Sequence, residues 1–94
     1  MGKEESFIQI GSSLLLSKKF QALSYGARVT YFAMMMESGG KRRFIFPAEI
    51  MDKYGLPMRS CRRHIYELIN SGFIRCVYEG KEQMNPNEYE FVSD

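Results

Sequence analysis

The feature that most constrains this chain is a break between two helical segments at residues 55–57, Gly-Leu-Pro. Proline cannot lie in a helix interior, because it lacks an amide hydrogen and clashes with the preceding turn, and it biases Leu56 toward extended backbone. Glycine ends the helix before it, because glycine adopts the left-handed conformation without steric cost. We therefore predict one helix over residues 48–54 and a second over residues 58–71.

The second helix of this pair has one apolar side and one basic side. Cys61, Ile65 and Leu68 recur every three to four residues, so they share one side of a helix and are expected to pack inward. Phe73 and Ile74 follow the helix and are expected to begin a half-buried strand. The opposite side of the helix holds polar and basic side chains, namely Arg59, Ser60, Arg62, Arg63, Tyr66 and Asn70.

Shorter elements are predicted on both sides of this helix pair from caps, glycines and apolar patterning. In chain order they are a short strand or extended arm at 7–10, one or two helical turns after Ser17, a helix over 25–37 capped by Ser24, and a strand at 43–46. Strands at 73–79 and 88–92 follow, joined by a hairpin whose tip is Gly80 and Lys81. The helix over 25–37 is apolar enough to be central and largely buried. Its Met34, Met35 and Met36 favour core packing over an interaction surface.

These elements together indicate the fold class. Two helices joined by a three-residue turn with glycine are typical of a helix-turn-helix, and a hairpin directly after the second helix is typical of a wing. We therefore predict a mainly α fold with a small β-sheet, a winged helix-turn-helix with a core of three to four helices and a β-hairpin wing. The 94 residues contain no linker or repeat, so residues 1–94 are expected to form a single domain.

The basic side chains concentrate around the predicted helix-turn-helix. Residues 41–75 hold eight Lys or Arg against three acids, whereas residues 76–94 hold one against five. Arginine can donate two hydrogen bonds to the O6 and N7 atoms of guanine, and other cations can hold the phosphate backbone. The predicted DNA contacts are Arg59, Ser60, Arg62, Arg63 and Tyr66 on the second helix, with Lys41, Arg42, Arg43, Arg75 and Lys81 along the flanking backbone.

The chain also resembles known families. The stretch 54–74 resembles the winged-helix pattern in which a glycine turn leads to a helix ending in Leu-x-x-x-Gly-Phe/Leu-Ile. Ile8-Gln9-Ile10, Leu14-Leu15, Leu23-Ser24-Tyr25-Gly26-Ala27 and Tyr31 resemble the amino-terminal domain of RepA-type plasmid replication initiators and of phage replisome organisers. The resemblance implies that the chain is the amino-terminal part of a longer protein from a plasmid or other mobile element.

Two departures from the winged-helix pattern affect the predicted contacts. Pro57 stands where many relatives place a Ser or Thr cap, so the hydroxyl contact near the phosphate backbone is absent. The hairpin carries Glu79, Glu82, Glu88 and Glu90, so it lacks the basic character of a wing that inserts deeply into the minor groove.

We expect sequence-specific binding of double-stranded DNA, in replication initiation or transcriptional regulation, with a homodimer or replication proteins as further partners. The alternative is a winged-helix protein-interaction or dimerisation module that does not bind DNA, because the same fold can bind either DNA or protein.

No catalytic activity, cofactor or small-molecule substrate is expected, since the sequence has no Gly-rich phosphate loop and no nucleophile beside a base. Cys61 and His64 have a spacing that can chelate a metal, but Cys76 is the only other soft ligand, so we expect a core cysteine and no metal site. The apolar runs are too short to span a bilayer, and two cysteines do not make a disulfide framework. A reduced, cytoplasmic protein is therefore expected.

Overall fold

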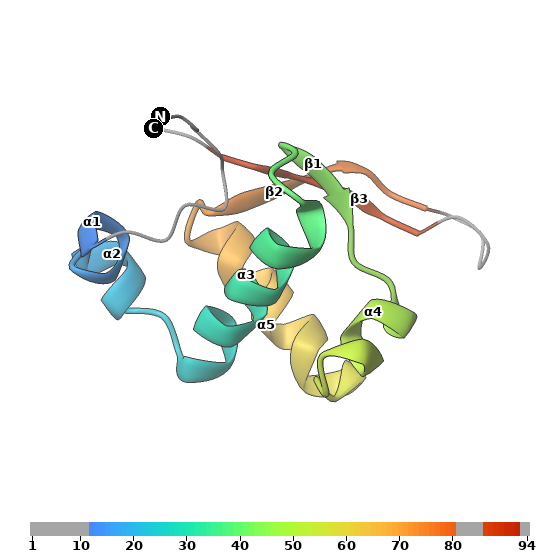
Figure 1. Cartoon of the computed structure of the whole chain (residues 1–94), viewed down its shortest axis with the longest axis horizontal. Helices are drawn as coiled ribbons and strands as arrows, with labels where there is room; N and C mark the ends of the chain where they lie inside the picture. The colour runs from blue at the N-terminus through green and yellow to red at the C-terminus, as the bar shows by residue number, and fades with distance from the viewer. Residues whose placement is uncertain (1–11, 81–85, 93–94) are drawn as a thin grey trace.

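A computed structural model describes residues 12–80 and 86–92 of the chain. Five helices in this part lie beneath a three-stranded antiparallel sheet (Figure 1). The elements are, in chain order, α1 (Ser12–Leu15), α2 (Lys18–Gln21), α3 (Tyr25–Ser38), β1 (Arg43–Ile45), α4 (Ala48–Lys53), α5 (Met58–Asn70), β2 (Ile74–Tyr78) and β3 (Glu88–Phe91). This arrangement confirms the predicted fold class, a winged helix-turn-helix in which α4 and α5 form the helix pair and β2 and β3 form the wing.

The local signals in the sequence place most of the helix ends. Ser17 and Ser24 are N-caps, whose hydroxyl oxygens accept hydrogen bonds from the amides of Phe20 and Ala27, each at 3.2 Å. Gly55 has a φ of +70°, the left-handed conformation that ends α4 and starts the turn into α5. Helix α1 was not predicted. The short strand or extended arm expected at residues 7–10 and the hairpin tip at Lys81 lie outside the described residues.

The sheet has the strand order β1-β3-β2, so the last strand lies in the middle. Phe44 pairs with Tyr89, and Ile74 pairs with Phe91. These four side chains are buried and face the helices; the Tyr31 ring of α3 meets the Phe91 ring edge-on, with 5.8 Å between centroids. Because side chains alternate along a strand, the neighbouring residues project from the opposite, outer face of the sheet.

Helix α3 is central, as predicted, but it is not covered on every side. Met34 and Met35 are buried in the core, which confirms their predicted role. Met36 is 61% exposed, so the core assignment is wrong for this third methionine. The reason is that α5 and the sheet cover one side of α3, and no described element lies over the side that carries Met36.

The contact between α3 and α5 depends on a close approach at Gly26. The imidazole ring of His64, on α5, occupies the space in which a side chain at Gly26 would lie. One turn further along α5, Glu67 Oε2 accepts a hydrogen bond from the Ser24 amide and Glu67 Oε1 accepts one from the Ser24 hydroxyl, both at 2.8 Å. The start of α3 is thereby held against α5 by packing and by charge-assisted hydrogen bonds.

This packing predicts that the effect of Gly26→Ala on the free energy of unfolding depends on His64. In the wild type the added methyl must displace the imidazole, and such overpacking costs about 1–3 kcal/mol, partly offset by the better helix propensity of alanine. In a His64→Ala background the same substitution should be neutral or stabilise the protein by up to about 1 kcal/mol. Urea denaturation of the four proteins measures this coupling, and an equal effect of Gly26→Ala in both backgrounds would contradict it.

Candidate nucleic-acid interface

The turn between α4 and α5 sets the position from which α5 begins. The amide of Leu56 donates to the Met51 carbonyl at 2.8 Å, and the amide of Gly55 donates to the Asp52 carbonyl at 3.0 Å, so the turn folds back on the end of α4. Pro57 is the N-cap residue of α5 and makes no side-chain capping hydrogen bond. The first amides of α5 therefore have no side-chain cap, as the proline at this position predicted.

Helix α5 has the apolar side and the basic side that its sequence predicted. Cys61, Ile65 and Leu68 are buried against the rest of the domain. The thiol of Cys61 lies in this core, where burial raises its pKa, so it behaves as a small apolar side chain. The side of α5 away from the core carries a ridge of polar residues, which we call the α5 ridge: Arg59, Arg62, Arg63, Tyr66 and Asn70, all exposed.

The three arginines of the α5 ridge are not neutralised by any residue that the structure describes. Within the described part of the chain, Arg59, Arg62 and Arg63 make neither an ion pair nor a hydrogen bond. The ring of Tyr66 is 67% exposed beside them, and Ser60 is half-buried at the edge of the ridge. The ridge therefore offers guanidinium donors that an external ligand can use without breaking an internal contact.

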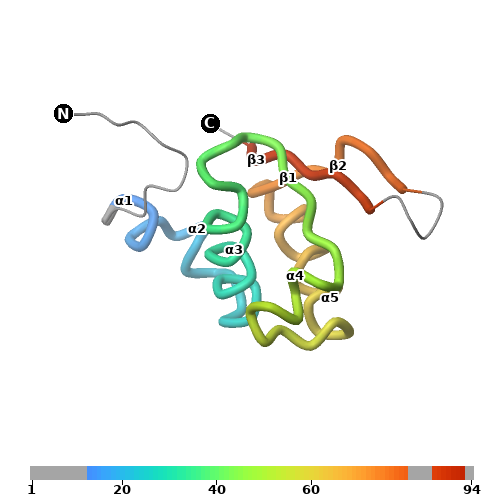
Figure 2. Tube along the Cα trace, turned by 45° about the vertical axis from the view of Figure 1, so that its right-hand side comes forward, coloured from blue at the N-terminus to red at the C-terminus, as the bar shows by residue number. Residues whose placement is uncertain are grey.

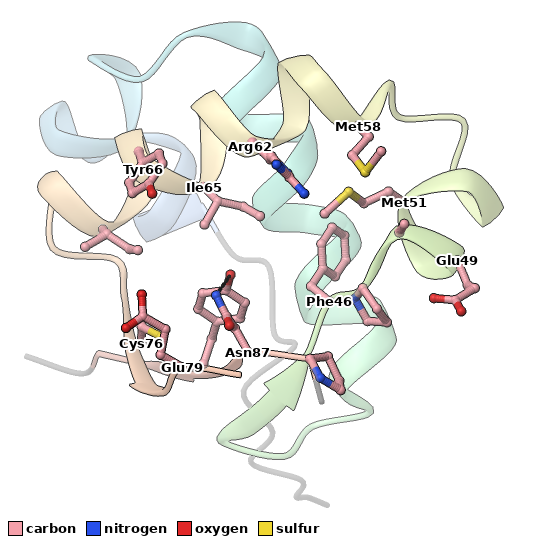
Figure 3. A pocket seen from close by; sticks show the side chains of 15 residues that line it. Phe46, Glu49, Met51, Met58, Arg62, Ile65, Tyr66, Cys76, Glu79 and Asn87 are labelled. Carbon is pink, nitrogen blue, oxygen red and sulfur yellow. Dashed lines mark hydrogen bonds between the residues drawn. The ribbon is translucent and has the colours of Figure 1, made fainter. Parts of the chain in front are cut away.

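A groove of about 590 Å³ separates α5 from the wing (Figure 3). Arg62 and Tyr66 border it on the α5 side, and Glu79 and Asn87 border it on the hairpin side. Its deeper lining is apolar and includes Phe46, Met51, Met58 and Ile65. The positive charge of this region therefore lies along α5 and not on the hairpin wall, as the acidic composition of the hairpin predicted.

The hairpin that forms the wing is braced near its tip. The amide of Gly80 donates a hydrogen bond to Asn87 Oδ1 at 2.8 Å, which joins the two arms of the hairpin. The strands extend past α4 and α5 to one side of the domain (Figure 2). Lys81, a predicted DNA contact, lies outside the described residues.

The basic residues at the sheet form a second group, which we call the sheet-face cluster. Arg42, Arg43 and Arg75 surround the carboxylate of Glu90: Arg75 donates to Oε1 with its Nε at 2.8 Å, and the Nε atoms of Arg42 and Arg43 lie 3.6 Å from Oε2. The pKa of Glu90 is lowered from its ordinary value, mainly by the hydrogen bond from Arg75. The Glu90 side chain is only 10% exposed, whereas the three arginines are at least 48% exposed.

The predicted site residues thus fall into two separate groups. Those on α5 lie together, and they are Arg59, Ser60, Arg62, Arg63 and Tyr66. Arg43 and Arg75 lie on the outer face of the sheet, which points away from the helices, and Lys41 and Arg42 are exposed just before β1.

Glu90 was predicted only as an acidic residue of the wing. Its pairing with arginines could not be found in the sequence, because it depends on the register that puts Arg43 and Arg75 on either side of it.

Glu67 is a second carboxylate whose role the sequence did not reveal. The pKa of Glu67 is lowered from its ordinary value mainly by the hydrogen bond from the Ser24 amide. The hydrogen bond from the Ser24 hydroxyl acts in the same direction. Glu67 is on α5 and Ser24 starts α3, 43 residues earlier. This contact orients α5, so it is a positioning contact for the α5 ridge.

Comparisons with known proteins agree on the fold. No family profile matches the chain, and no curated protein matches it significantly. A solved structure described as a Rep–DNA complex superposes with a TM-score of 0.63 at 15% identity, over 90% of this chain and 73% of that one. Another, described as the N-terminal domain of a DNA-binding protein, superposes with a TM-score of 0.60 at 15% identity, over 95% of this chain and 76% of that one. At this identity the likeness shows the shared fold.

The lowered pKa of Glu67 predicts how stability depends on pH. A carboxyl whose pKa is lower in the folded state stabilises the fold at pH values above its unfolded pKa of roughly 4.3, and this contribution is lost as the pH falls through the folded pKa. Glu67→Gln should therefore lower the free energy of unfolding by about 1 kcal/mol near pH 7. This value is at the low end for hydrogen bonds to a charged group, because the site is partly exposed. The difference between variant and wild type should shrink below about pH 4.

Chemical denaturation between pH 3 and pH 7 measures this difference. Glu79→Gln is the matched control, since the Glu79 carboxylate has no hydrogen bond or ion pair with the described residues. A Glu67→Gln difference that stays constant across the pH range would show that the Ser24 contact is not the source of stability.

Proposed function

We propose that this domain binds double-stranded DNA by placing α5 in the major groove. The observation that carries the proposal is the α5 ridge. Its three guanidinium groups, which have no partner among the described residues, stand with a tyrosine on the side of the helix opposite its packed side. The major groove is about 12 Å wide and admits one α-helix. The hairpin then lies beside the same duplex.

Different residues of α5 are proposed to position the duplex and to read it. Arg62 and Arg63 are the proposed base readers, because an arginine fork donates two parallel hydrogen bonds to guanine. Ser60 and Tyr66 donate single hydrogen bonds to phosphate or base edges. The side chain of Arg59, near the start of the helix, is also long enough to contact the DNA groove.

The sheet-face cluster points away from α5. Contacts of Lys41, Arg42 and Arg43 with flanking phosphates are therefore a secondary part of the proposal, because a duplex held against α5 must extend well beyond the helix to reach them.

Replication initiation is the proposed setting. It is supported by the resemblance of the sequence to amino-terminal domains of plasmid initiators and phage replisome organisers, and by the fold shared with the Rep–DNA complex. Regulation of transcription from the same kind of element is the alternative setting, since the same fold reads operators as well as origins.

Substitution of the α5 ridge tests base reading. If Arg62 or Arg63 reads a base, its change to alanine should weaken binding to the preferred duplex by about 1–3 kcal/mol. The preference for one base should also be relaxed at one position of the site. Oligonucleotide selection from a random pool first gives that duplex, and fluorescence anisotropy then compares it with random duplex. Lys18→Ala, which removes a positive charge from an exposed position on α2 outside the proposed interface, is the matched control and should change affinity little. Equal losses for Arg62→Ala on selected and random duplex would reject base reading.

Salt dependence tests whether phosphate contacts contribute at all. The logarithm of the binding constant should fall with the logarithm of salt concentration by about 0.9 for each phosphate contact on B-form DNA. Removing an α5 cation that touches phosphate should make this slope shallower by about 1, whereas Arg42→Ala with Arg43→Ala should alter it less. A flat salt response together with undetectable duplex binding would instead support the protein-interaction alternative.

A further inference from the structure

The exposed side chains of α5 form two lines along the helix. Met58, Arg62 and Tyr66 are spaced four residues apart, so they lie along one side, and all three line the groove between α5 and the hairpin (Figure 3). Arg59 and Arg63 form the other line, outside the groove lining. The groove side of α5 therefore carries a guanidinium group between a methionine and a tyrosine.

The groove side of α5 is apolar where the helix begins. Residues 56–58, Leu-Pro-Met, have no charged group and no hydrogen-bond donor in their side chains. Met58, the first residue of α5, is 48% exposed, whereas Phe46 and Met51, which line the groove more deeply, are buried. Met58 therefore extends the apolar lining of the groove to the surface of the domain.

The chemistry of the major groove limits what Met58 can contact there. A recognition helix presents the residues of its amino-terminal part to the base edges, and Met58 is the first of these. Its thioether has no hydrogen to donate to a phosphate or a base, and it is only a weak acceptor. The base pairs present hydrogen-bonding atoms and one apolar group, the C5 methyl of thymine. The thymine methyl is therefore the group of the major groove that is complementary to Met58.

We propose that Met58 determines specificity by contacting the C5 methyl of a thymine close to the guanine that Arg62 reads. This inference rests on the function proposed above. Methionine is unbranched and adaptable, so its side chain can follow the position of the methyl group. Four residues advance by about 6 Å along a helix, and successive base pairs are about 3.4 Å apart. The thymine is therefore expected within about two base pairs of the guanine.

Burial of apolar surface and the cost of burying a polar group both favour thymine at this position. The exposed end of Met58 and the thymine methyl remove each other from water, and burial of one methyl group strengthens binding about fourfold. Cytosine presents an amino group in the major groove and has no methyl at C5. Against Met58 that amino group would lose water without gaining an acceptor of comparable strength. Met58 therefore discriminates against cytosine as well as favouring thymine.

Replacement of thymine by uracil in the duplex tests the methyl contact. Deoxyuridine differs from thymidine only by the absence of the C5 methyl. The selected duplex is altered at each dT within two base pairs of the guanine whose preference Arg62→Ala relaxes, and fluorescence anisotropy gives the affinity of each altered duplex. The wild type should lose about fourfold in affinity at one of these positions. A selected duplex without a thymine in this range, or one that loses nothing on replacement, overturns the proposal.

Variants of Met58 assign the methyl contact to this residue. Met58→Gln keeps the length of the side chain but replaces its apolar end by an amide, so it should bind the dT and dU duplexes equally. Met58→Leu stays apolar and should retain a preference for dT. Met36→Gln makes the same change at an exposed methionine of α3, outside the proposed interface, and should retain the full preference. A Met58→Gln protein that still prefers thymine to the same extent as the wild type contradicts the proposal.

Methylated cytosine separates the methyl group from the other atoms of thymine. 5-Methylcytosine carries its methyl at the same ring position as thymine. The dT·dA pair found above is changed to dC·dG, and the duplex is compared with and without a methyl at C5 of this dC. The wild type should bind the methylated duplex more tightly, and Met58→Gln should bind both duplexes equally. An equal gain in the two proteins would show that another residue contacts the methyl and would reject the role of Met58.

The outcomes distinguish this inference from the proposed function. Specific duplex binding that Arg62→Ala weakens, with equal affinities of the wild type for dT and dU, would retain base reading by α5 and remove only the contact of Met58. The absence of binding to any duplex would remove both. A thymine preference that Met58→Gln abolishes and Met58→Leu retains supports both.

Discussion

The close contact between α3 and α5 is the constraint on which the rest of the structure depends. Gly26 leaves room for the His64 ring, and Glu67 accepts two hydrogen bonds from Ser24 at the first turn of α3. The buried side of α5 is thereby fixed against the core. Since α5 has only one apolar side, fixing that side also fixes the opposite one, and its arginines are directed to solvent. The candidate interface is therefore a consequence of how two helices pack.

The distribution of charge over the domain follows from the same packing. The cations of α5 have no internal partner among the described residues, whereas those of the sheet face surround the Glu90 carboxylate. Guanidinium groups without a partner can bind an external anion at little internal cost, and those that share a carboxylate must give up part of that contact. The α5 ridge and the sheet-face cluster are therefore chemically distinct surfaces on one small fold, each suited to a different kind of contact.

Patterns that act over a few residues were predicted correctly from the sequence. The caps at Ser17 and Ser24, the Gly55 turn and the two sides of α5 depend on local backbone preference or on helical spacing, so they could be found before the structure. The outward position of Met36 could not, because it shares its apolar character with Met34 and Met35 and differs only in what lies over it. The pairing of Glu90 also escaped prediction, since strand register depends on residues far apart in the chain.

The amino-acid sequence by itself determined the helix-turn-helix, the hairpin after it and the basic side of α5, because glycine, proline and the period of apolar residues act through neighbouring residues. Only the tertiary structure decided which cations share a carboxylate, that the α5 cations have no partner among the described residues, and which side of α3 no described element covers. Those properties arise when segments that are distant in the chain come into contact, as Ser24 and Glu67 do across 43 residues. Burial and electrostatic pairing are properties of the assembled surface, so no single segment encodes them.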